Sequence, residues 1–132
     1  MTPYFLFQIE SHSFLIETHR LVEILQTYEI YDIPRSPKHI LGFTAFRGSI
    51  AVLINLQSLL KVSPPTPKSR LIIFEYEHHN VGIIVDFVDM AHPLVSASTD
   101  LKHPLQTFLR QSYLHNDQIV RVLDLDALIK AL

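Results

Sequence analysis

Histidines and carboxylates are the residues of this chain that could do acid–base or metal chemistry, and the 132 residues include 8 histidines and 13 aspartates and glutamates. Only His78 and His79 are adjacent, and neighbouring side chains on a strand point to opposite faces, which makes this pair a poor chelate. No cysteine is present, and the three glycines cannot form a dinucleotide fingerprint, a P-loop or a Gly-x-Ser-x-Gly elbow. We therefore predict a protein that is not an enzyme and that has no metal site and no cofactor.

Two carboxylate pairs could be imagined to bind Mg²⁺ or to act as acid and base. Asp86 and Asp89 follow an apolar run, and Asp124 and Asp126 precede the last helical pattern of the chain. Each pair has a simpler interpretation. The first pair is typical of charges at a strand edge, and the second pair is typical of helix capping.

Arg47 and Glu23 stand out for a different reason. The sequence Arg47-Gly48-Ser49 separates two apolar runs, which predicts an arginine at the tip of a hairpin with glycine supplying a positive φ. The planar guanidinium of Arg47 could then donate two hydrogen bonds to a carboxylate, and the tight turn would restrict the positions that this side chain can reach. Glu23 is the only charged residue within the apolar run 21–25, so it must either turn out to water or find a partner. Arg47 is the candidate partner.

The positions of these residues depend on elements that occur twice in the chain. Residues 53–60 and 122–129 each combine an apolar run, an Asn or Asp, and leucines at helical spacing, at an offset of 69 residues. The same offset aligns residues 14–17 with residues 83–86. We interpret the chain as two related halves joined by a proline-rich linker near residues 62–69. Because about 60 residues bury little core alone, the halves are expected to pack together and to form a cleft.

Alternation of apolar and polar residues predicts mostly strands. The expected helices begin at residue 56, near residues 105–109, and at residue 125, and a loop is expected over residues 96–100. The expected strands cover residues 4–9, 13–17, 43–46, 50–54, 71–77, 81–88 and 119–123, and residues 21–25 are expected to form either a strand or a helical turn.

The composition fits an ordered globular protein, with 48% hydrophobic and 18% charged residues. The net charge is −2, and the sequence has no cluster of lysines and arginines of the kind that binds nucleic acid. No apolar run approaches the roughly 20 residues that cross a bilayer, and the first residues lack the pattern of a signal peptide. We therefore expect a cytoplasmic protein that does not insert into the membrane directly and whose partners are proteins or small ligands.

The order and spacing of several short motifs resemble the CheW family of chemotaxis adaptor proteins over essentially the whole chain. Residues 33–37 read Ile-Pro-Arg-Ser-Pro, residues 46–50 read Phe-Arg-Gly-Ser-Ile, and residues 54–56 read Ile-Asn-Leu, with Gly42 between the first two motifs. These motifs are similar to the family's Ile-Pro-x-x-Pro, Leu-Arg-Gly and Ile-Asp-Leu series. Further similar segments lie at residues 22–24, 81–86 and 123–125.

This resemblance implies a single CheW-like domain over residues 1–132, mainly β, with two small five-stranded SH3-like β-barrels packed around a groove and a few short helices, one of them C-terminal. It implies a non-catalytic adaptor that couples the regulatory domain of a CheA-type histidine kinase to the cytoplasmic hairpin tip of chemoreceptors. The adaptor would be associated with receptor arrays through these partners. Carried over by motif, Glu23, Gly42 and Arg47 fall on positions associated with receptor and array contacts, and together with Gly48 they are the implied protein-binding positions.

The chain also departs from the family pattern. Ala45-Phe46 replaces Asn-Leu, Val52 stands where proline is frequent, and Asn55 replaces aspartate. The partner is therefore left open, and a scaffold of a pilus-driven motility pathway or of another chemosensory-like system is the first alternative. A small β-barrel that binds a ligand or nucleic acid in its groove is the second, and an enzyme is the third.

Overall fold

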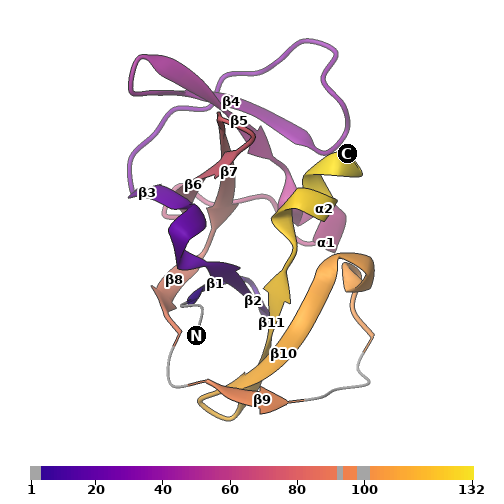
Figure 1. Cartoon of the computed structure of the whole chain (residues 1–132). Coiled ribbons are helices and arrows are strands. Elements are labelled where there is room, and N and C mark those ends of the chain that lie inside the picture. The colour runs from indigo at the N-terminus through magenta and orange to yellow at the C-terminus, as the bar shows by residue number, and fades with distance from the viewer. Residues whose placement is uncertain (1–3, 92–93, 98–101) are drawn as a thin grey trace.

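The computed structural model describes residues 4–91, 94–97 and 102–132, which form two β-sheets (Figure 1). We call the six-stranded sheet, in the order β8-β1-β2-β11-β10-β9, barrel A, and the five-stranded sheet, in the order β3-β6-β7-β5-β4, barrel B. The strands of barrel A are β1 (Tyr4–Ile9), β2 (His12–Glu17), β8 (Phe87–Met90), β9 (Val95–Ala97), β10 (Leu109–His115) and β11 (Gln118–Leu123). Those of barrel B are β3 (Leu21–Leu25), β4 (Ile40–Phe46), β5 (Ser49–Ile54), β6 (Arg70–Tyr76) and β7 (His79–Val85). The short helices are η1 (Thr18–Arg20), α1 (Leu56–Leu60), η2 (Gln106–Phe108) and α2 (Leu125–Lys130).

The predicted pair of small barrels is confirmed, with β9 as a sixth strand in barrel A where five were expected. The predicted strand 81–88 is instead two strands, because Asp86 leaves the ladder of barrel B and its backbone N–H donates to Gln8 of β1 at 2.8 Å. The helix predicted near residues 105–109 is the short η2, followed at once by β10, which the sequence pattern did not indicate. The predicted loop over residues 96–100 begins inside β9, and from residue 98 on it lies outside the described residues.

The predicted linker near residues 62–69 does not separate the two barrels. It connects α1 to β6, and the strands on both sides of it belong to barrel B, where β5 pairs with β7 in parallel. Barrel B is a continuous stretch from β3 to β7, inserted between the β1–β2 hairpin and the rest of barrel A. The two halves therefore do not form one barrel each.

The repeat is nevertheless visible in the pairing of the strands. The β1–β2 hairpin of the first half pairs with β8 and β11 of the second half, whereas the β6–β7 hairpin of the second half pairs with β3 and β5 of the first half. Each barrel thus contains the opening hairpin of one copy and the remaining strands of the other. The parallel pairs β2–β11 and β5–β7 are the junctions of this exchange.

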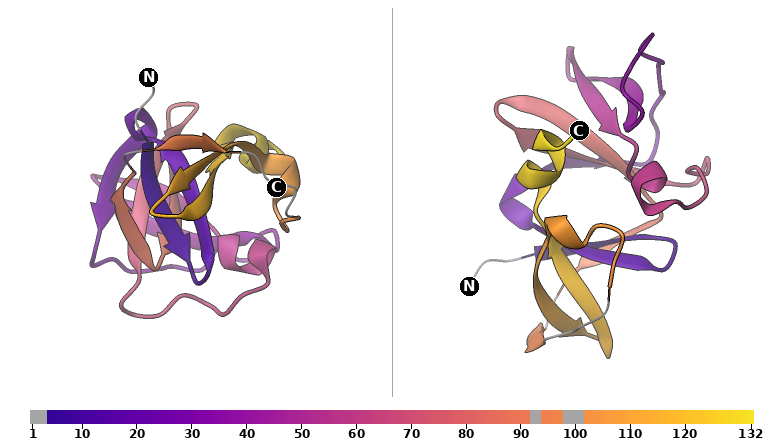
Figure 2. Two further views of the ribbon diagram at one scale, coloured as in Figure 1. Left: turned by 90° about the horizontal axis from the view of Figure 1, so that it is seen from below. Right: turned by 90° about the vertical axis from the view of Figure 1, so that its right-hand side faces the viewer.

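The largest apolar cluster lies between the barrels. Phe7 and Phe14 of barrel A and Phe74 of barrel B are fully buried in it, together with leucines of both α-helices. A smaller cluster fills each barrel. Figure 1 and the right-hand view of Figure 2 show α2 at the junction of the two barrels. The barrels therefore share one hydrophobic core, as expected for halves too small to fold alone.

The two α-helices begin in the same way. The Oδ1 atoms of Asn55 and Asp124 each accept a hydrogen bond from a backbone N–H in the first turn at 3.1 Å, as predicted for the helix-capping interpretation. Both helices have five or six residues and pack leucines into the shared core. No helix among the described residues is long and apolar enough to span a bilayer.

Candidate functional site

The predicted hairpin tip lies between β4 and β5. Arg47 and Gly48 have φ angles of 50° and 75°, and Phe46 pairs directly with Ser49, so the loop has two residues with positive φ. This conformation matches the right-handed twist of the flanking strands, and it is favoured by glycine. The turn projects Arg47 from the end of barrel B.

Arg47 and Glu23 form the predicted ion pair, through Nη2 of Arg47 and Oε1 of Glu23. The pair bridges β3 and the turn that follows β4, and β3 and β4 are the two outermost strands of the sheet of barrel B. The guanidinium also lies 4.8 Å from the ring centroid of Phe46, which is buried beneath it. Arg47 remains 61% exposed and Glu23 39%, so the pair is held in place but remains accessible to a partner.

The surface beside this pair is open and partly apolar. A Cβ at Gly48 would meet no atom within 4 Å, and Ile50 is 52% exposed on the neighbouring strand. Glu23, Arg47 and Gly48 therefore belong to one accessible surface, which we call the tip surface together with Ile50. An accessible arginine beside an exposed aliphatic side chain is typical of protein-binding surfaces.

Gly42 has a different environment from the tip surface. Its φ is 151°, and a Cβ there would lie 2.3 Å from the carbonyl oxygen of Tyr31. Tyr31 exchanges two backbone hydrogen bonds with Phe43, at 2.8 and 2.9 Å, which brings the segment before β4 against this strand. The Tyr31 hydroxyl donates to Glu29, and this hydrogen bond raises the pKa of the phenol. Gly42 is buried, and it permits close backbone packing.

A groove of about 430 Å³ lies between the barrels, along β3 of barrel B and β8 of barrel A. Phe87 is 42% exposed there. One basic and one acidic residue flank the apolar side chains. The groove is lined by Ile24, Gln26, Arg70, Phe87, Val88 and Asp89. It corresponds to the cleft that the repeat predicted.

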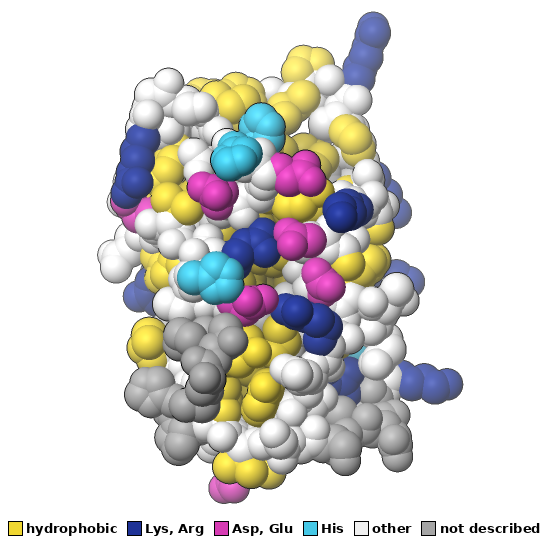
Figure 3. All heavy atoms as spheres, in the orientation of Figure 1, with side chains coloured by type: hydrophobic (Ala, Val, Ile, Leu, Met, Phe, Trp, Pro, Cys, Tyr) yellow, Lys and Arg dark blue, Asp and Glu magenta, His cyan; other side chains and the backbone are white. Residues whose placement is uncertain are grey.

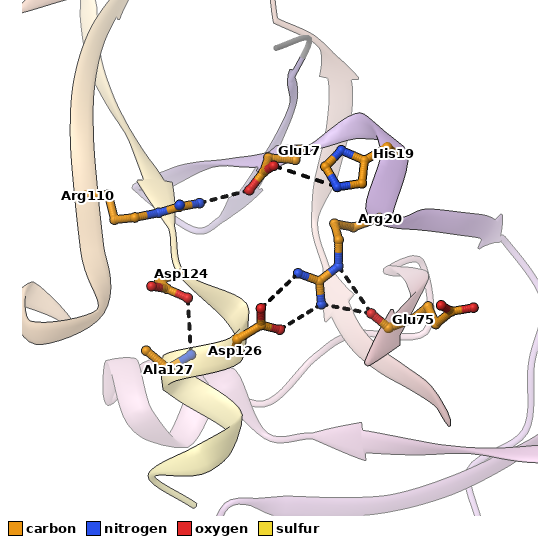
Figure 4. Close-up of polar contacts among 8 residues, drawn as sticks. All are labelled: Glu17, His19, Arg20, Glu75, Arg110, Asp124, Asp126 and Ala127. Atoms are coloured by element: carbon orange, nitrogen blue, oxygen red, sulfur yellow. Dashed lines mark hydrogen bonds and ion pairs between the residues drawn. The ribbon is translucent and has the colours of Figure 1, made fainter. Parts of the chain in front are cut away.

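A network around Arg20 was not found from the sequence. Arg20 is the last residue of η1, between β2 and β3. Its guanidinium donates to both carboxylate oxygens of Asp126, at 3.3 and 2.9 Å, and to the backbone carbonyl of Glu75, at 3.2 and 2.8 Å (Figure 4). Glu17 accepts from Arg110 at 3.0 Å nearby. The network joins barrel A, barrel B and α2. On the face drawn in Figure 3, acidic and basic side chains lie close together. The sequence gives no signal for these contacts, because the residues of each contacting pair are 55 or more positions apart.

The described residues offer no evident catalytic centre. His39 and Ser58 are hydrogen-bonded at 2.9 Å, but the Ser58 hydroxyl donates to the carbonyl of Asn55 at 2.8 Å. The serine therefore accepts from the histidine, whereas an activated nucleophile would donate to it. No group of three or more histidine, aspartate or glutamate residues lies close enough to hold a metal ion in the described part of the chain.

Comparisons with known proteins agree with this fold. The family model of the CheW-like domain matches residues 3–132. A probable chemotaxis protein CheW of Rhizobium etli is 25% identical, and the match covers 92% of this chain and 83% of that relative. The crystal structure of the scaffolding protein TtCheW from Thermoanaerobacter tengcongensis is similar, with a TM-score of 0.77, 20% identity, and coverage of 92% of this chain and 88% of that chain. The structural likeness supports the pair of SH3-like barrels.

Proposed function

The chain belongs to the CheW-like family, and on this premise we propose that it is a non-catalytic adaptor that couples a CheA-type histidine kinase to chemoreceptors on the cytoplasmic side of the membrane. The observation that carries the proposal is the tip surface, where the motif-matched Glu23 of β3 and Arg47 of the β4–β5 turn are brought together and remain exposed. The names of the relatives, a chemotaxis protein and a scaffolding protein, agree with this role.

An adaptor needs two surfaces that can be occupied at once. The tip surface lies at the end of barrel B, and it suits the regulatory domain of the kinase. The groove between β3 and β8 offers exposed Phe87 beside Ile24, with Arg70 and Asp89 at its sides. An amphipathic helical tip binds such a groove through its apolar face, which suits the receptor hairpin. The two surfaces share β3, which carries both Glu23 and Ile24.

The test is a charge reversal at the tip surface with a matched control. Arg47→Glu places a negative charge beside Glu23, and it should weaken kinase binding by about 1–3 kcal/mol if the contact lies near the centre of the interface. Arg110→Glu is the control, because Arg110 is also a half-exposed arginine paired with a glutamate but lies at β10. Both variants and the wild type are compared by calorimetry with the purified regulatory domain and by pull-down of receptor fragments.

The double variant Arg47→Glu/Glu23→Arg separates two roles of the pair. Recovery of binding would show that the internal ion pair shapes the surface, whereas no recovery would show that Arg47 contacts the partner directly. If Arg47→Glu binds both partners as tightly as the wild type, the tip surface is not the binding site. Co-purification from the native cell then identifies the partners, including those of a pilus-driven pathway.

A further inference from the structure

His12 and His103 form a hydrogen-bonded pair in barrel A. Nδ1 of His12, on β2, lies 3.0 Å from Nε2 of His103, and the two rings are nearly perpendicular at a centroid distance of 4.9 Å. Both rings also contact the buried ring of Phe14, His12 in a stacked and His103 in an edge-on arrangement. The pair connects the β1–β2 turn with the segment that leads into η2, 91 residues later.

A third hydrogen bond fixes the positions of the protons in this pair. The backbone N–H of Leu105 donates to Nδ1 of His103 at 3.0 Å, so a neutral His103 carries its proton on Nε2. That proton is donated to Nδ1 of His12, whose own proton therefore lies on Nε2. The result is a directed chain from Leu105 through His103 to His12 in which both rings are neutral.

Neither ring can take up a further proton at the paired nitrogen atoms without the loss of the Leu105–His103 or the His103–His12 hydrogen bond. A proton on Nδ1 of His103 would point at the N–H of Leu105, so two donors would face each other. A proton on Nδ1 of His12 would likewise point at the Nε2–H of His103. If His103 changes tautomer to accept from His12, its Nδ1–H again opposes the N–H of Leu105. Protonation of either ring at the paired atoms therefore removes at least one of the two contacts.

The surroundings of the pair also resist a proton. Lys102, His103 and Arg121 line a cavity of about 160 Å³ beside His12, and no carboxylate is among the described residues that line it. Burial, followed by the nearby His12 and Arg121, lowers the pKa of His103 from 6.5 to about 4. Because the folded pKa is depressed, the stability that the neutral ring provides is present above pH 6.5 and is lost as the pH falls toward 4.

The segment held by the pair supports the junction of the two barrels. Leu105 is 2% exposed and belongs to the shared core. Gln106 accepts from Arg121 at 3.0 Å, and the carbonyl of Phe108 accepts from the backbone of Asp124, the N-cap of α2, at 2.8 Å. Release of residues 102–108 would therefore expose Leu105 and weaken the support of α2.

We propose that the His12–His103 pair is a proton-operated latch, closed at neutral pH, that opens in mild acid and releases residues 102–108 from barrel A. The proposal does not depend on the adaptor function. The latch would couple the local pH to the mobility of η2 and of the start of α2. Among the described residues, the other titratable and charged groups that face it are Lys102 and Arg121, which are basic and favour the neutral, closed state.

Amide hydrogen exchange of the full chain between pH 7.5 and pH 4.5 tests the latch. After correction for intrinsic rates, exchange of the amides at 105–109 should increase by about tenfold per pH unit below about pH 6, because opening takes up one proton. Amides of β6 serve as the internal reference. Uniform exchange across both regions, or unchanged exchange at 105–109, would overturn the proposal.

Two variants and a tautomer measurement make the test specific. His103→Gln removes the ring whose pKa is lowered but retains hydrogen-bonding atoms, and it should remove most of the pH dependence at 105–109. His19→Gln is the matched control, since His19 is exposed beside Glu17, and it should behave as the wild type. If His103→Gln retains the wild-type pH dependence, the latch is wrong. Ring ¹⁵N shifts at pH 7.5 are expected to show the Nε2–H tautomer of His103, and the Nδ1–H tautomer would also contradict it.

Discussion

The two hairpins that end barrels A and B have the same backbone but different side chains. Arg47 and Gly48 have φ angles of 50° and 75°, and Asn116 and Asp117, 69 positions later, have 50° and 63°. In barrel B the turn is connected to β3 by the Arg47–Glu23 ion pair. In barrel A, Asn116 contacts only its neighbour His115 among the hydrogen bonds of the described residues, and β10 gains the additional strand β9. The repeat therefore specifies the backbone, and divergence of the side chains creates the tip surface.

The equivalence extends along both hairpins. Ile40 pairs with Ile54, and Leu109 pairs with Leu123, each at an offset of 69, and each ladder has a register shift immediately afterwards. In barrel B the shift is followed by Gly42, whereas the corresponding residue of barrel A is Gln111, which is exposed. The same bulge is thus closely packed against a backbone in one barrel and open to solvent in the other.

The exchange of hairpins makes the halves of the chain mutually dependent, and separating them should have the largest effect. Fragments 1–65 and 66–132 should each fail to fold, because each contains the opening hairpin of one barrel and the remaining strands of the other. Co-expression of the two fragments should restore the β-sheet signal in circular dichroism. A single half that melts cooperatively at the temperature of the full chain would contradict the exchanged arrangement.

Gly42 and Gln111 should differ strongly in their response to alanine. Gly42→Ala should destabilise the protein by about 2–4 kcal/mol, because the new Cβ meets the carbonyl of Tyr31 at a positive φ. Gln111→Ala, at the equivalent position, should change stability by less than about 0.5 kcal/mol. Urea denaturation of both variants measures the difference. Equal losses of stability in the two variants would mean that the segment around Tyr31 can move away from residue 42 without a cost in free energy.

Much of the fold could be predicted because it depends on local patterns. The capping of α1 and α2 and the turn at Arg47 follow from residues that are neighbours in sequence. The pairing of Glu23 with Arg47 could be predicted because a lone carboxylate in an apolar run needs a partner. Whether Glu23, Gly42, Arg47 and Gly48 bind partners remains a prediction.

The remaining features depend on contacts that are distant in sequence. The exchange of hairpins leaves the strand pattern unchanged, because a strand has the same alternation whichever partner it pairs with. For this reason the sequence pattern predicts a boundary between the barrels at the linker near residues 62–69, where the structure has none. β10 was missed because most of its side chains are partly or fully exposed, which removes the buried alternation that indicates a strand. The contacts of Arg20 and the histidine pair join positions 55 to 106 residues apart.

The smallest predicted effect concerns the stability contributed by the ion pair that distinguishes the two hairpins. A double-mutant cycle with Arg47→Gln and Glu23→Gln should give a coupling free energy of about 0.2–1 kcal/mol, because both side chains are well exposed to solvent. The coupling should fall as salt is raised, since exposed charges are screened. Asn116→Gln, in the untied hairpin, should leave stability within about 0.5 kcal/mol of the wild type. Urea denaturation at two ionic strengths measures these values. A coupling that is large and insensitive to salt would show that the pair is part of the barrel's structural closure, and partner binding would then have to use the apolar part of the tip surface around Ile50.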